Sequence, residues 1–89
     1  MRNVRVAWFV YIVTNSEALL YTGITTEPER RLREHNGTTK GARYTRGKGP
    51  WRIVYLEPVP DRIAALKREY AIKQLRRAQK LELISRSGT

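Results

Sequence analysis

Cysteine is absent from the 89-residue chain, and histidine occurs once, at His35. Without cysteine there is no disulfide framework and no zinc site built from thiolates, and one imidazole alone cannot hold a zinc cluster. Acidic residues are also scarce, with eight Asp and Glu against eighteen Lys and Arg. This scarcity argues against a hydrolytic centre with two metal ions, which needs several converging carboxylates.

A long hydrophobic run is missing as well, since a helix that spans a bilayer takes about 20 apolar residues. The start of the chain, MRNVRVAWFVYIV (residues 1–13), sets two arginines before an apolar stretch in the way of a signal peptide. No small-residue cleavage site follows, so we expect a cytoplasmic protein. The length predicts a single domain over residues 1–89, with no room for a second recognition domain.

Positive charge is what the chain has in excess. The formal net charge of +10 and the pI near 10.7 predict a polyanionic partner, nucleic acid first and an anionic membrane surface second. From Arg30 to Arg52 there are eight basic residues and one acid, Glu34. This part of the chain is therefore the predicted contact surface.

Residues 37–50, GTTKGARYTRGKGP, form the centre of the basic region and predict a loop with a helical turn near residues 42–45. Tyr44 and Trp51 alternate with the charges, which suits phosphate contact plus base stacking, although Trp51 fits better as a residue packed at the edge of a strand. The alternative is an ordinary solvated loop, which the unbalanced charge disfavours. The predicted DNA-binding residues are Lys40, Arg43, Tyr44, Arg46, Lys48 and Arg52.

Residues 6–13, VAWFVYIV, are apolar at odd and even positions alike, which predicts a central strand covered on both faces. With the following LLYTG they predict a hairpin over residues 6–23, whose loop is residues 15–17. Thr14 would then face Ala18, and Tyr11 would lie directly opposite Tyr21 on one face.

Gly23 follows Tyr21 by two positions and so shares that face, where its missing side chain leaves room for another group. The alternative is that Gly23 only ends the strand. The two tyrosines would then be ordinary strand residues with packed rings and wet hydroxyls.

A short helix is predicted from about residue 26 to Asn36. Thr26 and Glu29 have the spacing of a capping box, Pro28 suits the first turn, and Asn36-Gly37 predicts a left-handed stop. Arg31 and His35 are four residues apart and share one face of this helix. A face that carries Arg and His in place of aliphatic residues indicates a site.

The second half of the chain predicts a third strand over residues 51–57, ended by Pro58 and Pro60. Asp61 would cap a helix over residues 62–75, and a short closing helix would follow over residues 76–84. The apolar stripes expected to face the core are Ile63, Leu66 and Tyr70 in the first helix and Ala78, Leu81 and Ile84 in the second.

Glu69 borders the first of these stripes and has two alternative roles. It could form a helix-surface ion pair with Arg62 or Lys73, or it could be a metal ligand. Phosphodiester hydrolysis with one carboxylate is possible if a single Mg²⁺ completes its shell with water and phosphate. Arg31 could then bind the phosphoryl oxygens, and a tyrosine helped by neighbouring cations could serve as the base.

The order Phe9-Val10-Tyr11, then Tyr21-Thr22-Gly23, then Arg31, His35 and Glu69 resembles the GIY-YIG nuclease superfamily. The small standalone bacterial members are the most similar, together with the nuclease domain of the eukaryotic structure-specific subunit that cuts branched DNA. The resemblance covers about residues 7–84, with residues 85–89 as a frayed tail. Phe9-Val10 replaces Gly-Ile and Thr22 replaces Ile, but neither change removes a reacting group.

The resemblance implies an α+β fold, a small three-stranded antiparallel sheet flanked by helices. It also implies site roles. Tyr11 and Tyr21 would be the motif tyrosines, one of which positions or deprotonates the attacking water, and Gly23 the motif glycine. The remaining roles fall to Arg31 as catalytic arginine, His35 as the residue that assists the tyrosine, Asn36 as a structural residue and Glu69 as the Mg²⁺ ligand.

The function expected from this resemblance is that of an endonuclease dependent on Mg²⁺, or Mn²⁺ in its place, which cuts branched, flapped or single-stranded DNA in DNA repair. Little sequence specificity is expected, because shape and access would decide where it acts. We also expect a monomer or weak dimer, with a protein partner for full activity and no membrane. The alternatives are a non-catalytic nucleic-acid-binding module and a basic partner subunit on the same scaffold.

Overall fold

The computed structural model describes residues 7–37 and 40–87, so the predictions for residues 1–6, 38–39 and 88–89 lie outside the described residues. The elements follow one another as β1 (Trp8–Thr14), β2 (Leu20–Thr25), α1 (Pro28–Asn36), the 3₁₀ turn η1 (Arg43–Thr45), β3 (Arg52–Val59), α2 (Arg62–Lys73) and α3 (Arg77–Ser87). The strands form one antiparallel sheet in the order β2-β1-β3. This confirms the predicted α+β fold with a three-stranded antiparallel sheet flanked by helices.

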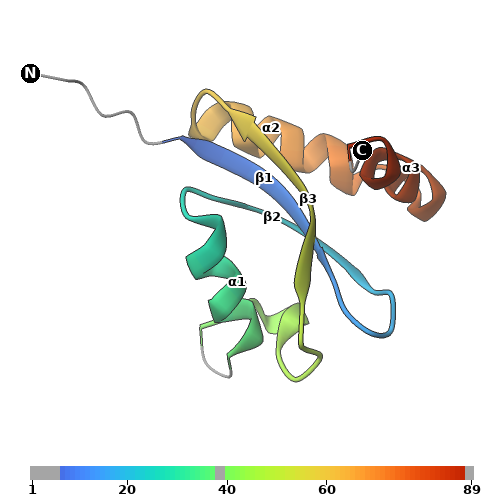
Figure 1. The fold of residues 1–89 in the computed structure, drawn as a ribbon. Coiled ribbons are helices and arrows are strands. Elements are labelled where there is room, and N and C mark those ends of the chain that lie inside the picture. Colours follow the sequence, from blue (N-terminus) through green and yellow to red (C-terminus); the bar gives the residue numbers. More distant parts are fainter. Residues whose placement is uncertain (1–6, 38–39, 88–89) are drawn as a thin grey trace, which may run out of the picture.

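The helices cover both faces of the sheet, with α2 and α3 on one side and α1 on the other (Figure 1). Alternate residues of the central strand β1 therefore enter two separate cores. Val10 and Ile12 pack with Ala65 and Ile72 of α2. Tyr11 and Val13 pack on the opposite face in a cluster that includes Trp51 and Leu32. The predicted central strand is confirmed, and its odd positions face α1.

The register of the hairpin differs from the predicted one by two residues. Tyr11 lies opposite Gly23, and Tyr21 lies opposite Val13. The loop is longer than predicted because the Asn15 side chain accepts hydrogen bonds from the backbone N–H groups of Glu17 and Leu19, at 3.1 and 3.0 Å. A shift of two residues preserves the face of each side chain, so the prediction that both tyrosines share a face stands.

Strand β3 runs through Pro58 to Val59, so the prediction that Pro58 ends the strand is wrong. Pro58 pairs with Phe9, which is possible because β3 is an edge strand and the missing N–H can point away from the sheet. A bulge lies between Ile12 and Val13, which face Tyr55 and Ile53.

Helix α1 begins at Pro28, two residues later than predicted, and no side chain caps its first turn. The capping box is absent. The Thr25 hydroxyl instead accepts the N–H of Glu27 at 3.0 Å, which forms a turn directly after β2. Gly37 is also not left-handed, since its φ is −88° and its ψ −170°. The chain leaves the helix in an extended conformation, and the Asn36 side chain bonds to the backbone of Trp51, which lies outside the helix.

Asp61 caps α2 as predicted, since its side chain accepts the N–H of Ala64 at 2.8 Å. The predicted core stripe is wrong, however, because Ile63 and Tyr70 are 66% and 68% exposed. The buried positions are Ala65 and Ile72, which lie on the opposite side of the helix at 3.6 residues per turn. Small Ala65 lets the helix approach the sheet closely.

In helix α3 the predicted core position Ile84 is confirmed, and Leu83 packs beside it. The other two predicted positions are wrong, because Ala78 and Leu81 are exposed. The helix continues to Ser87, so residues 85–87 are helical and the predicted frayed tail is wrong for them. The Ser87 hydroxyl donates to the carbonyl of Ile84 at 3.0 Å in this last turn. Within the described part of the chain, no helix is both long and apolar enough to cross a membrane.

Candidate active site

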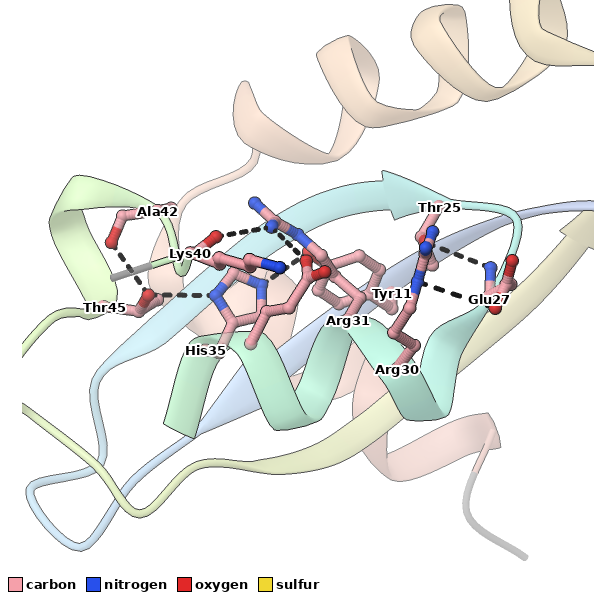
Figure 2. A network of polar contacts seen from close by, with 10 residues as sticks. Tyr11, Thr25, Glu27, Arg30, Arg31, His35, Lys40, Ala42 and Thr45 are labelled. Carbon is pink, nitrogen blue, oxygen red and sulfur yellow. Dashed lines mark hydrogen bonds and ion pairs between the residues drawn. The ribbon is translucent and has the colours of Figure 1, made fainter. Parts of the chain in front are cut away.

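Tyr11 and His35 are both buried, at 2% and 1% exposed, and the site is built around their contact. Tyr11 comes from the central strand, and its hydroxyl oxygen lies 2.7 Å from Nε2 of His35 (Figure 2). The ring occupies the space above Gly23 on the neighbouring strand. A Cβ atom at Gly23 would lie 2.7 Å from Cζ of Tyr11 and closer still to the hydroxyl oxygen. Gly23 is therefore required at this position by the ring across from it.

His35 is held at both nitrogens, and the contacts fix its tautomer. Nδ1 lies 2.9 Å from the hydroxyl of Thr45, which donates its one proton to the carbonyl of Ala42 at 2.9 Å. Thr45 can therefore only accept from His35, so we assign the proton of the imidazole to Nδ1. Nε2 then has a free lone pair, and the Tyr11 hydroxyl donates to it.

The charges of the two rings follow from their surroundings. The pKa of His35 is lowered to about 4, mainly by burial and also by the positive charge of Arg31, while Glu34 opposes the change. Burial also raises the pKa of Tyr11 to about 12, although the guanidinium of Arg31 pulls it down. At neutral pH the pair is thus a neutral phenol donating to a neutral imidazole. The hydrogen bond gives a path for a proton from Tyr11 to His35, although burial disfavours the charged form of each ring.

Arg31 projects from the same side of α1 as His35 (Figure 2). Its Nη1 donates to Oε1 of Glu34 at 2.8 Å and to the carbonyl of Lys40 at 3.0 Å. These contacts fix one edge of the guanidinium, while 28% of the side chain remains exposed. Because a guanidinium carries five N–H donors, Arg31 keeps donors that could bind a phosphoryl group beside Tyr11.

Glu69 enters from α2, which lies on the other face of the sheet from α1. Helix α2 also contacts the edge strand β2, and the carboxylate of Glu69 is close enough to Tyr11 for its charge to raise the pKa of that phenol. Its Oε2 lies 3.1 Å from Nζ of Lys73, so the predicted ion pair with Lys73 is confirmed. The Glu69 side chain is 19% exposed, and its second role as a metal ligand remains a prediction.

Tyr21 lies beside His35 without a polar contact to it. The two rings meet edge to face with centroids 5.1 Å apart, and Tyr21 stacks on Tyr44 at 5.9 Å. Lys48 holds its ammonium 4.3 Å from the centre of the Tyr44 ring. Tyr44 thus has protein partners already, although it is 41% exposed and can still meet a base at the surface.

Asn36 joins the end of α1 to the start of β3. Its Nδ2 donates to the carbonyl of Trp51 at 3.1 Å, and its Oδ1 accepts the Trp51 N–H at 2.5 Å. Trp51 is buried and donates its indole N–H to the carbonyl of Thr45 at 2.9 Å. The two side chains together fix η1, and with it the hydroxyl that holds His35.

The predicted DNA-binding cations all lie at the surface around η1 and the start of β3. Lys40, Arg43, Arg46, Lys48 and Arg52 are exposed. Across residues 7–37 and 40–87, no carboxylate forms an ion pair with any of these five. Their charge is therefore available to a polyanion.

Thr45 and Lys80 are two residues at this site that sequence reasoning missed. The expected helical turn near residues 42–45 placed Thr45 correctly, but nothing in the spacing pairs it with a histidine ten residues earlier. Lys80 lines a cavity with Tyr21 and Lys73, and a single lysine on a terminal helix gives no signal of its own.

A metal ion at this site would have one protein ligand. Among the described residues, no group of three or more His, Asp and Glu side chains could hold an ion. Glu69 alone suits Mg²⁺, which keeps several waters and is commonly bound by one carboxylate plus substrate phosphate. The donor set therefore fits Mg²⁺ or Mn²⁺ and does not fit zinc.

Comparison with known proteins gives one family. The family described as the GIY-YIG catalytic domain matches residues 7–82. The UPF0213 protein DP2720 of Desulfotalea psychrophila is 55% identical over 83 residues, covering 93% of this chain and 76% of that protein. The UPF0213 protein YhbQ of Escherichia coli K12 is 46% identical over 78 residues, covering 88% and 77%. The solution NMR structure of the UPF0213 protein BH0048 from Bacillus halodurans aligns with a TM-score of 0.60 at 40% identity, covering 92% and 86%.

Proposed function

The chain belongs to the GIY-YIG catalytic domain family, a nuclease superfamily, and on that premise we propose that it is a Mg²⁺-dependent endonuclease that hydrolyses DNA phosphodiester bonds. The observation that carries the proposal is the contact of 2.7 Å between Tyr11 and His35, with the Arg31 guanidinium at the same phenol. A buried proton acceptor behind a phenol, beside a cation suited to phosphate, is the arrangement that water-mediated phosphodiester cleavage needs.

In the proposed reaction, a water molecule attacks the phosphorus and gives its proton to the Tyr11 oxygen. The bond from the phosphorus to the leaving sugar oxygen breaks, and that oxygen takes a proton from a solvent water. Tyr11 passes its own proton to Nε2 of His35 in the same step, because burial disfavours a free phenolate. The added negative charge on the attacked phosphate offsets the charge on the resulting imidazolium. Arg31 donates hydrogen bonds to the phosphoryl oxygens and stabilises their growing charge.

Glu69 is the residue that would hold Mg²⁺ or Mn²⁺ at this site. The ion, when bound, supplies positive charge against the phosphoryl oxygens and the leaving oxygen. The carboxylate is 19% exposed and within electrostatic range of Tyr11, which supports this assignment.

The proposed substrates are branched, flapped or single-stranded DNA. Support comes from the five exposed cations around η1, which suit phosphates rather than base edges. Phosphate contacts position a strand without reading its sequence, so shape and access decide where cleavage occurs. We place this activity in cytoplasmic DNA repair, carried out by a monomer or weak dimer that gains full activity with a protein partner.

A nicking assay tests the proposal. With supercoiled plasmid and a labelled branched DNA in Mg²⁺, we expect nicking that stops on addition of EDTA. Arg31→Ala and Glu69→Gln should lose at least about 100-fold in rate, in line with the loss of one transition-state contact. Glu69→Gln should still bind DNA in a gel-shift assay. Equal nicking by the wild type and both variants would point to a contaminating nuclease and refute the proposal.

One observation favours the alternative of a non-catalytic nucleic-acid-binding module. The Glu69 carboxylate is paired with Lys73, as a surface carboxylate without a metal would be. This alternative predicts DNA binding that weakens with salt and no nicking in any divalent metal.

A further inference from the structure

A cavity of about 310 Å³ opens beside the candidate active site, between the edge strand β2 and the two C-terminal helices. It is lined by Leu20, Tyr21, Thr22, Tyr44, Lys73 and Lys80. Two of these residues tie it to the site, because Tyr21 contacts the His35 ring and Lys73 pairs with Glu69. The cavity therefore lies next to the site, with Tyr21 and Lys73 contacting residues of both.

The chemistry of the lining points to an anion of the size of a phosphate. Lys73 and Lys80 supply two ammonium groups from different helices, and Tyr21, Tyr44 and Thr22 supply aromatic surface and hydroxyl groups. Among the described residues, none that lines the cavity carries a carboxylate, although Lys73 itself is paired with Glu69. Lys80 forms no ion pair within the described part of the chain, so an anion in the cavity would meet the uncompensated charge of Lys80.

We propose that this cavity binds a backbone phosphate of the nucleic acid next to the scissile one, and that Lys73 leaves Glu69 to make this contact. The nucleic acid would thereby free the Glu69 carboxylate for the metal ion. The phosphate site rests on the cavity alone, while the release of Glu69 rests on the proposed function.

The Glu69–Lys73 pair is suited to such an exchange. It joins residues four apart on one helix, at 3.1 Å, and the Lys73 side chain is 48% exposed. Pairs between residues four apart on one helix are weak, and a phosphate bound by two lysines is the stronger partner. A lysine also reaches a new partner easily because its stem is flexible.

The first experiment measures the phosphate contact without cleavage. Binding of a fluorescein-labelled single-stranded oligonucleotide is followed by anisotropy in EDTA over a series of salt concentrations, for Lys73→Gln, Lys80→Gln and the control Lys67→Gln. Lys67 is exposed on α2 and does not line the cavity. Each lost phosphate contact should make the log–log salt slope shallower by about 0.7 for a single strand.

We expect this change in Lys73→Gln and Lys80→Gln and none in Lys67→Gln. Slopes equal to that of the wild type in both cavity variants would overturn the phosphate site. Because EDTA prevents cleavage, the result does not depend on whether the protein is a nuclease.

The second experiment measures the release of Glu69 by Mn²⁺ titration of the free protein, read by electron paramagnetic resonance. Lys73→Gln should bind Mn²⁺ about three- to tenfold more tightly than the wild type, because the competing cation is gone. Lys67→Gln should match the wild type, and Glu69→Gln should lose the site. Unchanged Mn²⁺ binding in Lys73→Gln would overturn the exchange. Absent nicking together with tighter Mn²⁺ binding in Lys73→Gln would refute the nuclease and show only that Lys73 competes with a metal ion for Glu69.

Discussion

The hydroxyl of Tyr11 lies 2.7 Å from Nε2 of His35, and this buried contact joins the central strand to the last turn of α1. The chain of hydrogen bonds continues from His35 to Thr45 and from Thr45 to the carbonyl of Ala42. One chain of hydrogen bonds thus connects β1, α1 and η1, which come from separate parts of the sequence. In this chain of hydrogen bonds Tyr11 is the donor to His35, and the oxygen of Tyr11 faces the site.

The two motif tyrosines should therefore differ in their effect on the proposed cleavage. Tyr11→Phe removes the hydroxyl that contacts His35 and should slow nicking by about 100-fold or more, within the range for loss of a general base. Tyr21→Phe keeps the ring contacts with His35 and Tyr44 and should cost less than about tenfold. Initial nicking rates at saturating DNA make the comparison. A larger loss in Tyr21→Phe would reverse the assignment of the base.

Thr45→Val should disturb the site without touching the substrate. It removes the acceptor of the Nδ1 proton, so a buried donor is left unpaired and the protein should lose about 1–3 kcal/mol of stability. The fixed tautomer of His35 should also be lost, which two-dimensional NMR of the imidazole nitrogens detects. Thr45→Ser keeps the hydroxyl and serves as the control. If Thr45→Val leaves the nitrogen shifts of His35 unchanged, Thr45 does not position the ring.

The free energy of unfolding should fall as the pH is lowered from 6.5 towards 4, the range between the ordinary pKa of a histidine and the pKa of buried His35. The folded state holds the pKa of His35 at about 4, below the ordinary 6.5, so the unfolded chain binds a proton that the folded chain does not. Stability is then fully present above pH 6.5 and declines towards pH 4, with a loss of about 2 kcal/mol by pH 5. Urea unfolding at pH 7 and pH 5 measures this loss.

His35→Gln is the control for that experiment, because it removes the titrating group. The hydrogen bond with Arg31 also holds the pKa of Glu34 below its ordinary value. Protonation of Glu34 therefore lowers stability too, but at a more acidic pH. The interval between pH 7 and 5 therefore reports mainly on His35. An equal pH dependence in His35→Gln would assign the effect to other groups.

Gly23→Ala should destabilise the protein through the Tyr11 ring. The added Cβ would lie 2.7 Å from Cζ of Tyr11, which is buried and cannot move freely, so a cost of about 1–3 kcal/mol is expected. Gly37→Ala is the matched control, since its Cβ would meet its nearest atoms at 3.5 Å, an ordinary contact. Thermal unfolding of the two variants tests the difference. Similar melting temperatures would mean that the ring adjusts without cost.

Much of the fold follows from local patterns. The apolar residues on both sides of β1 predict a central strand, because only a strand covered on both faces can bury both sets. Asp61 predicts the start of α2, because its side chain satisfies a free N–H of the first turn. The order of two tyrosines, Arg31, His35 and Glu69 predicts the family, since the sequence carries these residue types at fixed spacings. The match over residues 7–82 confirms that family.

Other features depended on parts of the chain that are distant in sequence. The buried side of α2 is set by the space that Ala65 leaves against the sheet. Pro58 stays in β3 because that strand lies at the edge. Neither of these facts is visible in the spacing of residues alone.

The sequence by itself determined the strands and helices, the family and the excess of positive charge, because each depends on residue type and on separation along the chain. Only the tertiary structure decided that Tyr11 is the tyrosine bound to His35 and that Thr45 fixes the imidazole. These pairings arise when separate elements pack together, and packing selects partners by shape and distance in space.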